Sequence, residues 1–224
     1  MLLLLLAPAL AGERELAGYD PVPGERVYLV DLDGRPAGSA RSELRRAEGL
    51  WLSTQRFDVP VASQMNETRF EPETLRPLSM TLTSTQAGFS VVTRLSMEGA
   101  TLVMDAPRRE AKDQRERIEV EVPAGTVFPG MEEHLLVSRP LSAGAGFSIP
   151  SFDPVSRQVR TLEFRVTGRE RVSVPAGVFE AWRVEISGGA APGVAHVRVG
   201  RPLLVRLQVN RPAEFTFKLE VWKD

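Results

Sequence analysis

The chain has 224 residues, 42% of them hydrophobic, and its 28 basic and 29 acidic side chains leave a formal net charge of -1. This composition is sufficient for one well-packed core, and the near-zero net charge excludes an overall electrostatic attraction to nucleic acid. Because the chain has no cysteine, a disulfide framework, a thiolate metal site and a cysteine nucleophile are excluded as well.

The N-terminus has the pattern of a secretory signal peptide. A short apolar run, Leu2 to Leu6, precedes Ala9-Leu10-Ala11, which fits the small-x-small cleavage pattern. We therefore expect residues 1–11 to be a signal peptide and the protein to be exported, to the periplasm or elsewhere in a bacterial envelope. The run lacks the usual basic leading segment, so either the start lies further upstream or the chain is trimmed. No other stretch has ~18 consecutive apolar residues, so no membrane span is expected.

The first half of the remaining chain predicts a series of short strands. The segment ERVYLVDLDGRPAGSARSEL contains Asp33-Gly34, a strong hairpin signal, and we expect Pro36 and Gly38 to lengthen the loop. Alternation of polar and apolar side chains is typical of half-buried strands. It predicts further strands at residues 50–57, 64–70, 78–83, 89–95 and 101–105.

Two segments depart from this alternation. Residues 106–120 are densely charged and could form an exposed helix or two polar edge strands joined by a loop. Pro129-Gly130 begins a segment that we expect to form one or two helical turns, with Met131, Leu135 and Leu136 facing the sheet.

The sequence Val-Pro-Ala-Gly occurs at residues 122–125 and again at 174–177. At the second position Pro175 fixes its φ angle and Gly177 tolerates a positive φ, which predicts a hairpin turn. A phosphate-binding loop would need several glycines between a strand and a helix, and that pattern is absent here. The first copy is interpreted as a strand end leading into the helical segment.

Strands continue to the end of the chain. Leu162, Phe164 and Val166 alternate with charged residues, and residues 203–210 and 215–222 predict an antiparallel pair. The spacing of about a dozen short strands is typical of a sandwich or barrel. We therefore expect a mainly β protein, with a single β-rich domain at residues 12–224.

Several motifs resemble a family of uncharacterised exported bacterial proteins sometimes called TapB-like. They are strand and turn motifs in the segments DGRPAG, EPETLRPLSM, LLVSRPLSAG and VTGRERVSVPAGVFEAWRVE. Residues in two of these segments match the family pattern: Pro72, Thr74, Leu75, Arg76, Pro77, Leu78, Gly168, Glu170, Val174, Pro175, Ala176, Gly177, Phe179 and Trp182. A later strand adds the matching pair Val205 and Arg206. Glu71 stands where the family often has Asp. The resemblance implies a single strongly curved antiparallel sheet, a half-barrel similar to the lipoprotein carriers LolA and LolB. In such a fold the concave face can enclose an apolar cavity closed by one or two short helices.

Enzyme chemistry has little support in the sequence. The only histidines, His134 and His196, are far apart, and no nucleophile-elbow pattern surrounds the nearby serines. Glu132 to His134 offers three metal-ligand types in a row, but adjacent helical residues diverge by about 100°, so a solvated acidic turn is favoured. We interpret His196 as a surface residue. No catalytic residue, metal ligand or cofactor is predicted.

Binding of an apolar ligand is the sharper hypothesis. A β half-barrel that its side chains do not fill leaves a cavity, and methionine adapts to irregular apolar shapes. The cavity candidates are Trp51, Phe57, Met65, Phe70, Met80, Phe89, Met97, Met104, Phe147 and Phe152. The alternative is that they pack together as an ordinary core. The glycine-rich residues 142–154 could be a lid or an irregular connection.

The expected function is therefore an exported envelope protein that binds or carries a lipid, an acyl group or another apolar ligand. A second hypothesis is an envelope structural or assembly module that offers an open sheet edge to a protein partner and has a filled interior. A hydrolase is the weakest of the three.

Overall fold

The computed structural model describes residues 21–108, 111, 113–189, 192–201, 203–210 and 213–223, and the expected signal peptide lies outside them. Within these residues fourteen strands form one antiparallel sheet in the order β8-β7-β6-β5-β4-β3-β2-β1-β14-β13-β12-β11-β10-β9. The strands are β1 (Gly24–Leu32), β2 (Arg35–Ala47), β3 (Leu50–Val59), β4 (Ala62–Phe70), β5 (Pro77–Gln86), β6 (Phe89–Glu98), β7 (Thr101–Pro107), β8 (Arg115–Glu121), β9 (Gly146–Asp153), β10 (Gln158–Val174), β11 (Gly177–Ser187), β12 (Gly193–Arg198), β13 (Leu204–Asn210) and β14 (Glu214–Lys223).

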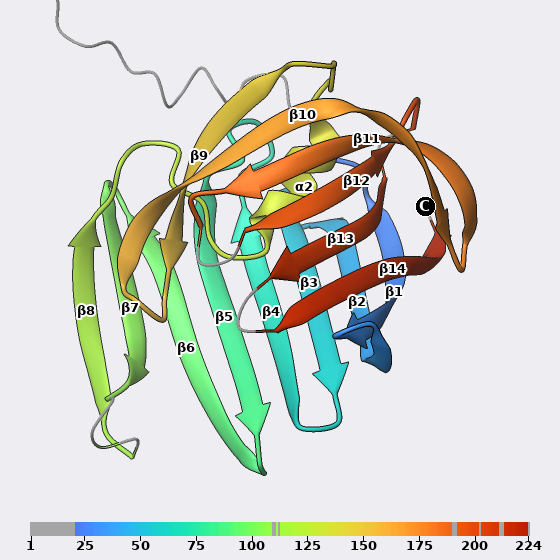
Figure 1. Ribbon diagram of the computed structural model, residues 1–224. Helices are drawn as coiled ribbons and strands as arrows, with labels where there is room; N and C mark the ends of the chain where they lie inside the picture. The colour runs from blue at the N-terminus through green and yellow to red at the C-terminus, as the bar shows by residue number, and fades with distance from the viewer. Residues whose placement is uncertain are drawn as a thin grey trace, which may run out of the picture.

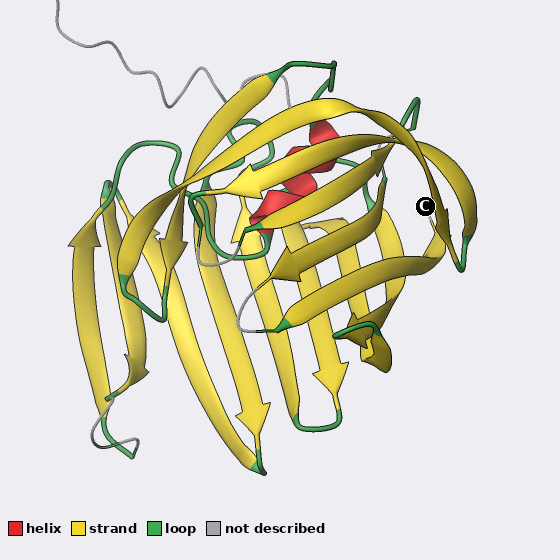
Figure 2. Ribbon diagram, in the orientation of Figure 1, coloured by secondary structure: helices red, strands yellow, loops and turns green. Residues whose placement is uncertain are grey.

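Almost every strand pairs with its neighbours in the chain. The exception is the pairing of β1 with β14, which joins the two ends of the described chain in the middle of the sheet. We call β1–β8 the N-terminal arm and β9–β14 the C-terminal arm. The sheet curves so that the arms face each other, and helix α2 (Met131–Ser138) lies between them (Figures 1 and 2). The sheet is not closed, because β8 and β9 are its two edges. The prediction of a curved, mainly β fold with a short helix is confirmed.

Short turns set the strand register. Asp33 and Gly34 have φ angles of 49° and 74°, the left-handed values that a two-residue hairpin turn needs. The expectation of a longer loop is wrong, because Pro36 and Gly38 lie inside β2. Pro175-Ala176 forms the predicted turn, and Val174 pairs with Gly177 across it.

The densely charged residues 106–120 reach from the end of β7 into the edge strand β8. The two ends of this segment lie in β7 and β8, which pair with each other, so the strand alternative is confirmed over the helix. Residues 142–154, for which a lid and an irregular connection were the alternatives, are mainly the regular strand β9 at the other edge of the sheet. Residues 122–130 lead from β8 to α2, as predicted for the first Val-Pro-Ala-Gly copy.

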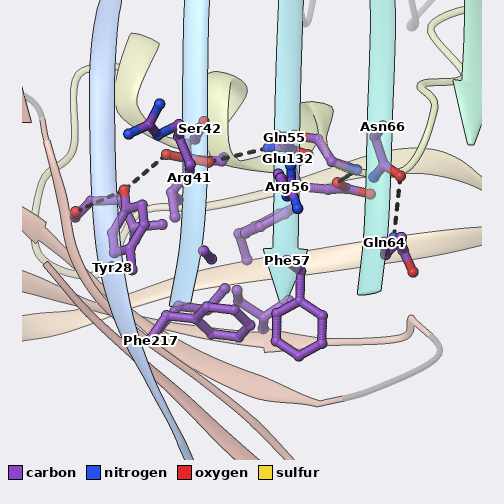
Figure 3. Close-up of a pocket in the computed structure, with 18 residues that line it drawn as sticks. Tyr28, Arg41, Ser42, Gln55, Arg56, Phe57, Gln64, Asn66, Glu132 and Phe217 are labelled. Carbon is purple, nitrogen blue, oxygen red and sulfur yellow. Dashed lines mark hydrogen bonds between the residues drawn. The ribbon is translucent and has the colours of Figure 1, made fainter. Parts of the chain in front are cut away.

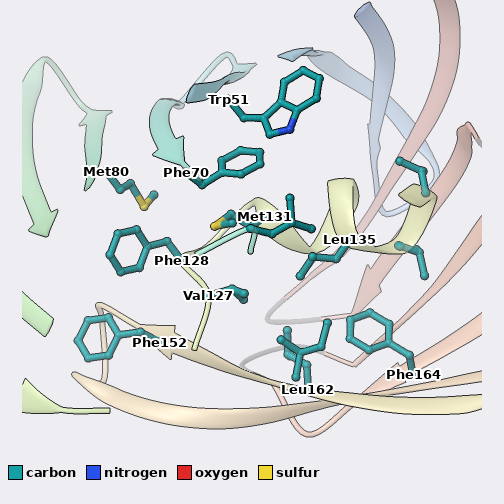
Figure 4. Close-up of a cluster of buried hydrophobic side chains, with 14 of the residues drawn as sticks. Trp51, Phe70, Met80, Val127, Phe128, Met131, Leu135, Phe152, Leu162 and Phe164 are labelled. Atoms are coloured by element: carbon teal, nitrogen blue, oxygen red, sulfur yellow. The ribbon is translucent and has the colours of Figure 1, made fainter. Parts of the chain in front are cut away.

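The main core lies between the arms and encloses one side of α2. Figure 4 shows aromatic side chains of the N-terminal arm above the helix segment and those of the C-terminal arm below it. The buried side chains of this core include Trp51, Phe70, Met80, Val127, Phe128, Met131, Leu135, Phe152, Leu162 and Phe164. A second, smaller cluster includes Tyr28, Val172, Val174, Ala181, Leu203, Val205 and Leu219.

Contacts cross the seam between the two edge strands. Glu116 of β8 forms an ion pair with Arg157, which lies in the turn after β9. Val127 donates its N–H to the carbonyl oxygen of Pro150 (2.9 Å), and its own carbonyl accepts from the N–H of Phe152 (3.0 Å). These contacts hold the open side of the curved sheet together.

Candidate functional site

A pocket of about 250 Å³ lies between the two arms beside α2. The inward positions of β1 to β4, the first turn of α2 and the C-terminal arm all border it. Figure 3 shows Ser42, Gln55 and Asn66 across neighbouring strands on the helix side, with Phe57 and Phe217 further along the strands. The pocket therefore has a polar end near the helix and an apolar remainder.

The apolar walls come from both arms and the helix. Aliphatic and aromatic side chains there have no hydrogen-bonding capacity, so a ligand chain lying against them would lose contact with water, at about 25 cal/mol per Å² of apolar surface. These residues are Ala40, Phe57, Leu136, Phe164, Ile186, Leu204, Leu207 and Phe217.

The polar end is organised by the two glutamates at the start of α2. Glu133 accepts hydrogen bonds from the Tyr28 hydroxyl (3.0 Å) and from Nε2 of Gln55 (3.2 Å). Gln55 Nε2 also donates to the carbonyl oxygen of Gly130 (2.9 Å). Glu132 accepts from the N–H of Gly130 (2.6 Å), at the helix N-terminus. The helix is thus tied to β1 and β3 through carboxylates that border the pocket.

Burial changes the protonation equilibria of these groups. Removal from water raises the pKa of Glu132, because it disfavours the charged carboxylate, although hydrogen bonds from Ser151 and the backbone oppose this rise. Burial also raises the pKa of Tyr28 well above its usual value, with the nearby Glu133 charge adding to the effect. The tyrosine is therefore a neutral hydrogen-bond donor.

His134 is buried beside the pocket. It is 2% exposed, its Nε2 lies 2.6 Å from Oγ of Ser53, and burial lowers its pKa to about 4. Neither residue lines the pocket, and the Nδ1 of His134 has no partner among the described residues. A nucleophilic serine needs an accessible hydroxyl and a group that orients the histidine, and this pair has neither. The interpretation of residues 132–134 as a solvated turn is wrong, because the two arms enclose the helix.

His196 is also not a surface residue. It is 2% exposed and pairs with Glu170. Burial lowers its pKa, while the glutamate opposes that shift. Among the described residues, no group of three or more potential His, Asp or Glu ligands could hold a metal ion.

The predicted cavity residues have different locations. Trp51, Phe70, Met80, Met104 and Phe152 are buried in the main core, as the alternative of ordinary packing foresaw, and Met97 and Phe147 pack against it. Phe57 alone of the ten lines the pocket.

Two of the ten do not face the interior. Met65 is 43% exposed because it lies on the opposite face of β4 from Asn66 and Phe70. Phe89 is 81% exposed at the start of β6, although its position has the same parity as the buried Leu95. The turn between β5 and β6, which precedes Phe89, extends past the C-terminal arm (Figure 1).

The polar residues of the pocket were missed by the sequence analysis, although the two-residue period points to some of them. Gln55 lies two positions from both the buried Ser53 and the inward Phe57, so it shares their face of β3. Asn66 is four positions before the buried Phe70 and therefore shares its face of β4. No comparable signal exists for Glu132 and Glu133, whose burial depends on how the arms close around the helix.

A second hollow lies at the rim. It has a volume of about 690 Å³ and is bordered by the segment before β5, the β6–β7 turn and residues 122–126. Met97 contributes to its lining. Most of its borders are loop residues with small or apolar side chains, and three of the bordering residues, Glu71, Glu73 and Arg76, are charged. No helix in the described part of the chain has the length and apolar character needed to cross a membrane.

Comparisons with known proteins show the family and the fold. A family described as "Protein of unknown function (DUF3108)" matches residues 27–212. The crystal structure of a β-barrel-like protein of domain of unknown function DUF1849 from Brucella abortus is similar, with a TM-score of 0.64 at 13% identity, covering 92% of this chain and 98% of that one. A putative exported protein with a YmcC-like fold from Bacteroides fragilis aligns over 93% of this chain and all of its own, with 10% identity and a TM-score of 0.34. No curated protein matches the chain. The TapB-like label and the likeness to LolA and LolB stay predictions.

Proposed function

The chain belongs to the DUF3108 family, and we propose that it is an exported binding or carrier protein that holds a small lipid, an acyl group or a similar apolar ligand between its two arms. The observation that supports this proposal is the pocket beside α2, whose walls are apolar and whose one end is polar. Binding sites for small molecules commonly combine an apolar lining with a few polar groups that orient the ligand.

The pocket volume limits the size of the ligand. An apolar cavity of ~150 Å³ accepts benzene, which has six non-hydrogen atoms. On the same scale, the 250 Å³ pocket has room for about ten non-hydrogen atoms. This corresponds to one medium-length acyl chain and excludes a complete two-chain lipid, unless part of the lipid remains outside the pocket.

Export is the second part of this proposal. It is supported by the apolar run and small-x-small motif of residues 1–11, which are typical of a signal peptide. An apolar ligand has little solubility in water, so a carrier in a bacterial envelope would shield it between membranes.

The assembly-module alternative has less support. An open edge that recruits another strand needs free backbone groups, yet β8 alternates charged residues along its length and the N–H and carbonyl of Val127 occupy part of the β9 edge. A serine hydrolase built on the Ser53–His134 pair has less support, because this pair is buried and does not border the pocket.

Filling the pocket tests the proposal. Ala40→Phe adds a ring to the wall of the pocket, and Val61→Phe adds the same ring at a site that is 70% exposed. We expect the wild type and Val61→Phe to enhance the fluorescence of 1-aminonaphthalene, an apolar probe with about as many non-hydrogen atoms as the pocket accommodates, and Ala40→Phe to bind it at least tenfold more weakly.

Native mass spectrometry of protein purified from a bacterial host would then look for a co-purified small molecule. Equal probe binding by the wild type and Ala40→Phe, or no binding by either, would contradict a ligand site between the arms. Circular dichroism of each variant checks that the fold is retained.

A further inference from the structure

The polar end of the pocket contains two carboxylates, Glu132 and Glu133, beside the amides of Gln55 and Asn66. Glu132 and Glu133 contribute carboxylate oxygens, which accept and cannot donate when ionised. The Gln55 amide nitrogen is already engaged with Gly130 and Glu133, so its oxygen is the part that remains to bind a ligand. A ligand head that donates hydrogen bonds would complement this set.

Ser42 provides an independent indication of a polar ligand group. Its side chain borders the pocket, the residue is 3% exposed, and its Oγ has no hydrogen-bond partner among the described residues. A buried hydroxyl without a partner costs free energy, and native structures rarely contain one. A ligand head at this end of the pocket would supply the missing partner.

The charges around the pocket oppose an anionic head. Arg41 and Arg56 also border it, but their guanidinium groups pair with Glu25 and Asp58, and each arginine side chain is 63% exposed. Two carboxylates therefore border the pocket without a bordering arginine that is free to neutralise them. Like charges brought together in a site of low dielectric repel each other strongly.

Arg26 is a buried cation near the polar end of the pocket. It is 2% exposed and is the cross-strand neighbour of Ser42. Its Nη2 donates to the carbonyl oxygen of Val22 (2.8 Å), whereas Nε and Nη1 have no partner among the described residues. Arg26 does not border the pocket, so a ligand there meets the two glutamates first.

We propose that the ligand is a single-chain amphiphile whose head is a neutral or cationic hydrogen-bond donor, an alcohol or a primary amine, and not a carboxylate. Its head lies at Ser42, Gln55 and Glu133, and its chain runs along the apolar walls toward Phe57 and Phe217. This assignment rests on the proposed function and specifies its ligand class.

Three ligands with the same chain separate the head groups. Isothermal titration calorimetry at pH 7.5 would compare 1-nonanol, nonylamine and nonanoate, which have about the number of non-hydrogen atoms that the pocket accommodates. We expect nonanol and nonylamine to bind at least tenfold more tightly than nonanoate.

Variants at the polar end assign the effect to residues. Ser42→Ala should weaken nonanol binding by about two- to tenfold, the range expected for one hydrogen bond. Ser39→Ala, on the exposed face of the same strand, is the matched control and should leave binding unchanged. Glu133→Gln should reduce the preference for nonylamine over nonanoate at least threefold.

The outcomes distinguish the two proposals. If nonanoate bound as tightly as the other two ligands or more tightly, the head-group assignment would be overturned, but the ligand site would remain. If Arg26→Met then lost nonanoate binding, the site would be an anion site instead. Binding of none of the three ligands would overturn the proposed function itself. An unchanged affinity for nonanol in Ser42→Ala would also contradict the assignment.

Discussion

The buried His134 should make the protein sensitive to mild acid. Its pKa is lowered from 6.5 to about 4 because burial disfavours the imidazolium, whereas the unfolded chain keeps the ordinary value. The unfolded state therefore binds a proton first as the pH falls. Stability from this group is complete above pH 6.5 and is lost progressively toward pH 4. At pH 5 the two pKa values give a loss of about 2 kcal/mol relative to pH 7.5.

His134→Gln isolates this effect, because a glutamine amide can keep a hydrogen bond to Ser53 and does not titrate in this range. Urea unfolding followed by tryptophan fluorescence would measure both proteins at pH 7.5 and pH 5. The variant will have a lower stability at pH 7.5 but should lose about 2 kcal/mol less on acidification, or roughly 4 to 8 °C in Tm for a chain of this size. An equal loss in both proteins would show that the histidine is not desolvated and would contradict the depressed pKa.

Four further substitutions test the fold. Phe152→Ala empties a fully buried core position and should lower the free energy of unfolding by about 3 to 5 kcal/mol in urea denaturation. Phe89→Ala, at an exposed position, should change it by less than about 0.5 kcal/mol in the same assay. Glu116→Gln weakens the ion pair with Arg157 and should speed amide hydrogen exchange in β8 about fivefold, while unchanged exchange would show that the seam does not depend on this pair. Gly38→Ala would place a Cβ 2.0 Å from a backbone oxygen of β3 and should lower stability by about 1 to 3 kcal/mol; a neutral result would contradict that close approach.

Local rules were sufficient to predict most strands. The alternation around Leu162 to Val166, the Asp33-Gly34 turn and the Pro175-Ala176 turn all depend on interactions within a few residues. The pairing of β1 with β14 depends on segments about 190 positions apart, and no local pattern specifies it.

The site was harder to predict for the same reason. Choosing large apolar residues by type selected the core, since Phe70 and Phe152 fill the interior and do not border the pocket. Strict use of the two-residue period would have separated Met65 from Phe70, because an odd spacing in one regular strand places them on opposite faces. The burial of Glu132 follows from the closure of the arms, which is a tertiary property.

The β1–β14 pairing also has a consequence for synthesis. Strands of the N-terminal arm leave the ribosome first, but the partner of β1 is the last strand of the described chain. Until β14 is available, β1 and β13 each present an unpaired backbone edge, which favours association with other chains. A nascent polypeptide is therefore exposed to aggregation until its last strand is made, and a chain shortened by its final ten residues would retain that hazard permanently.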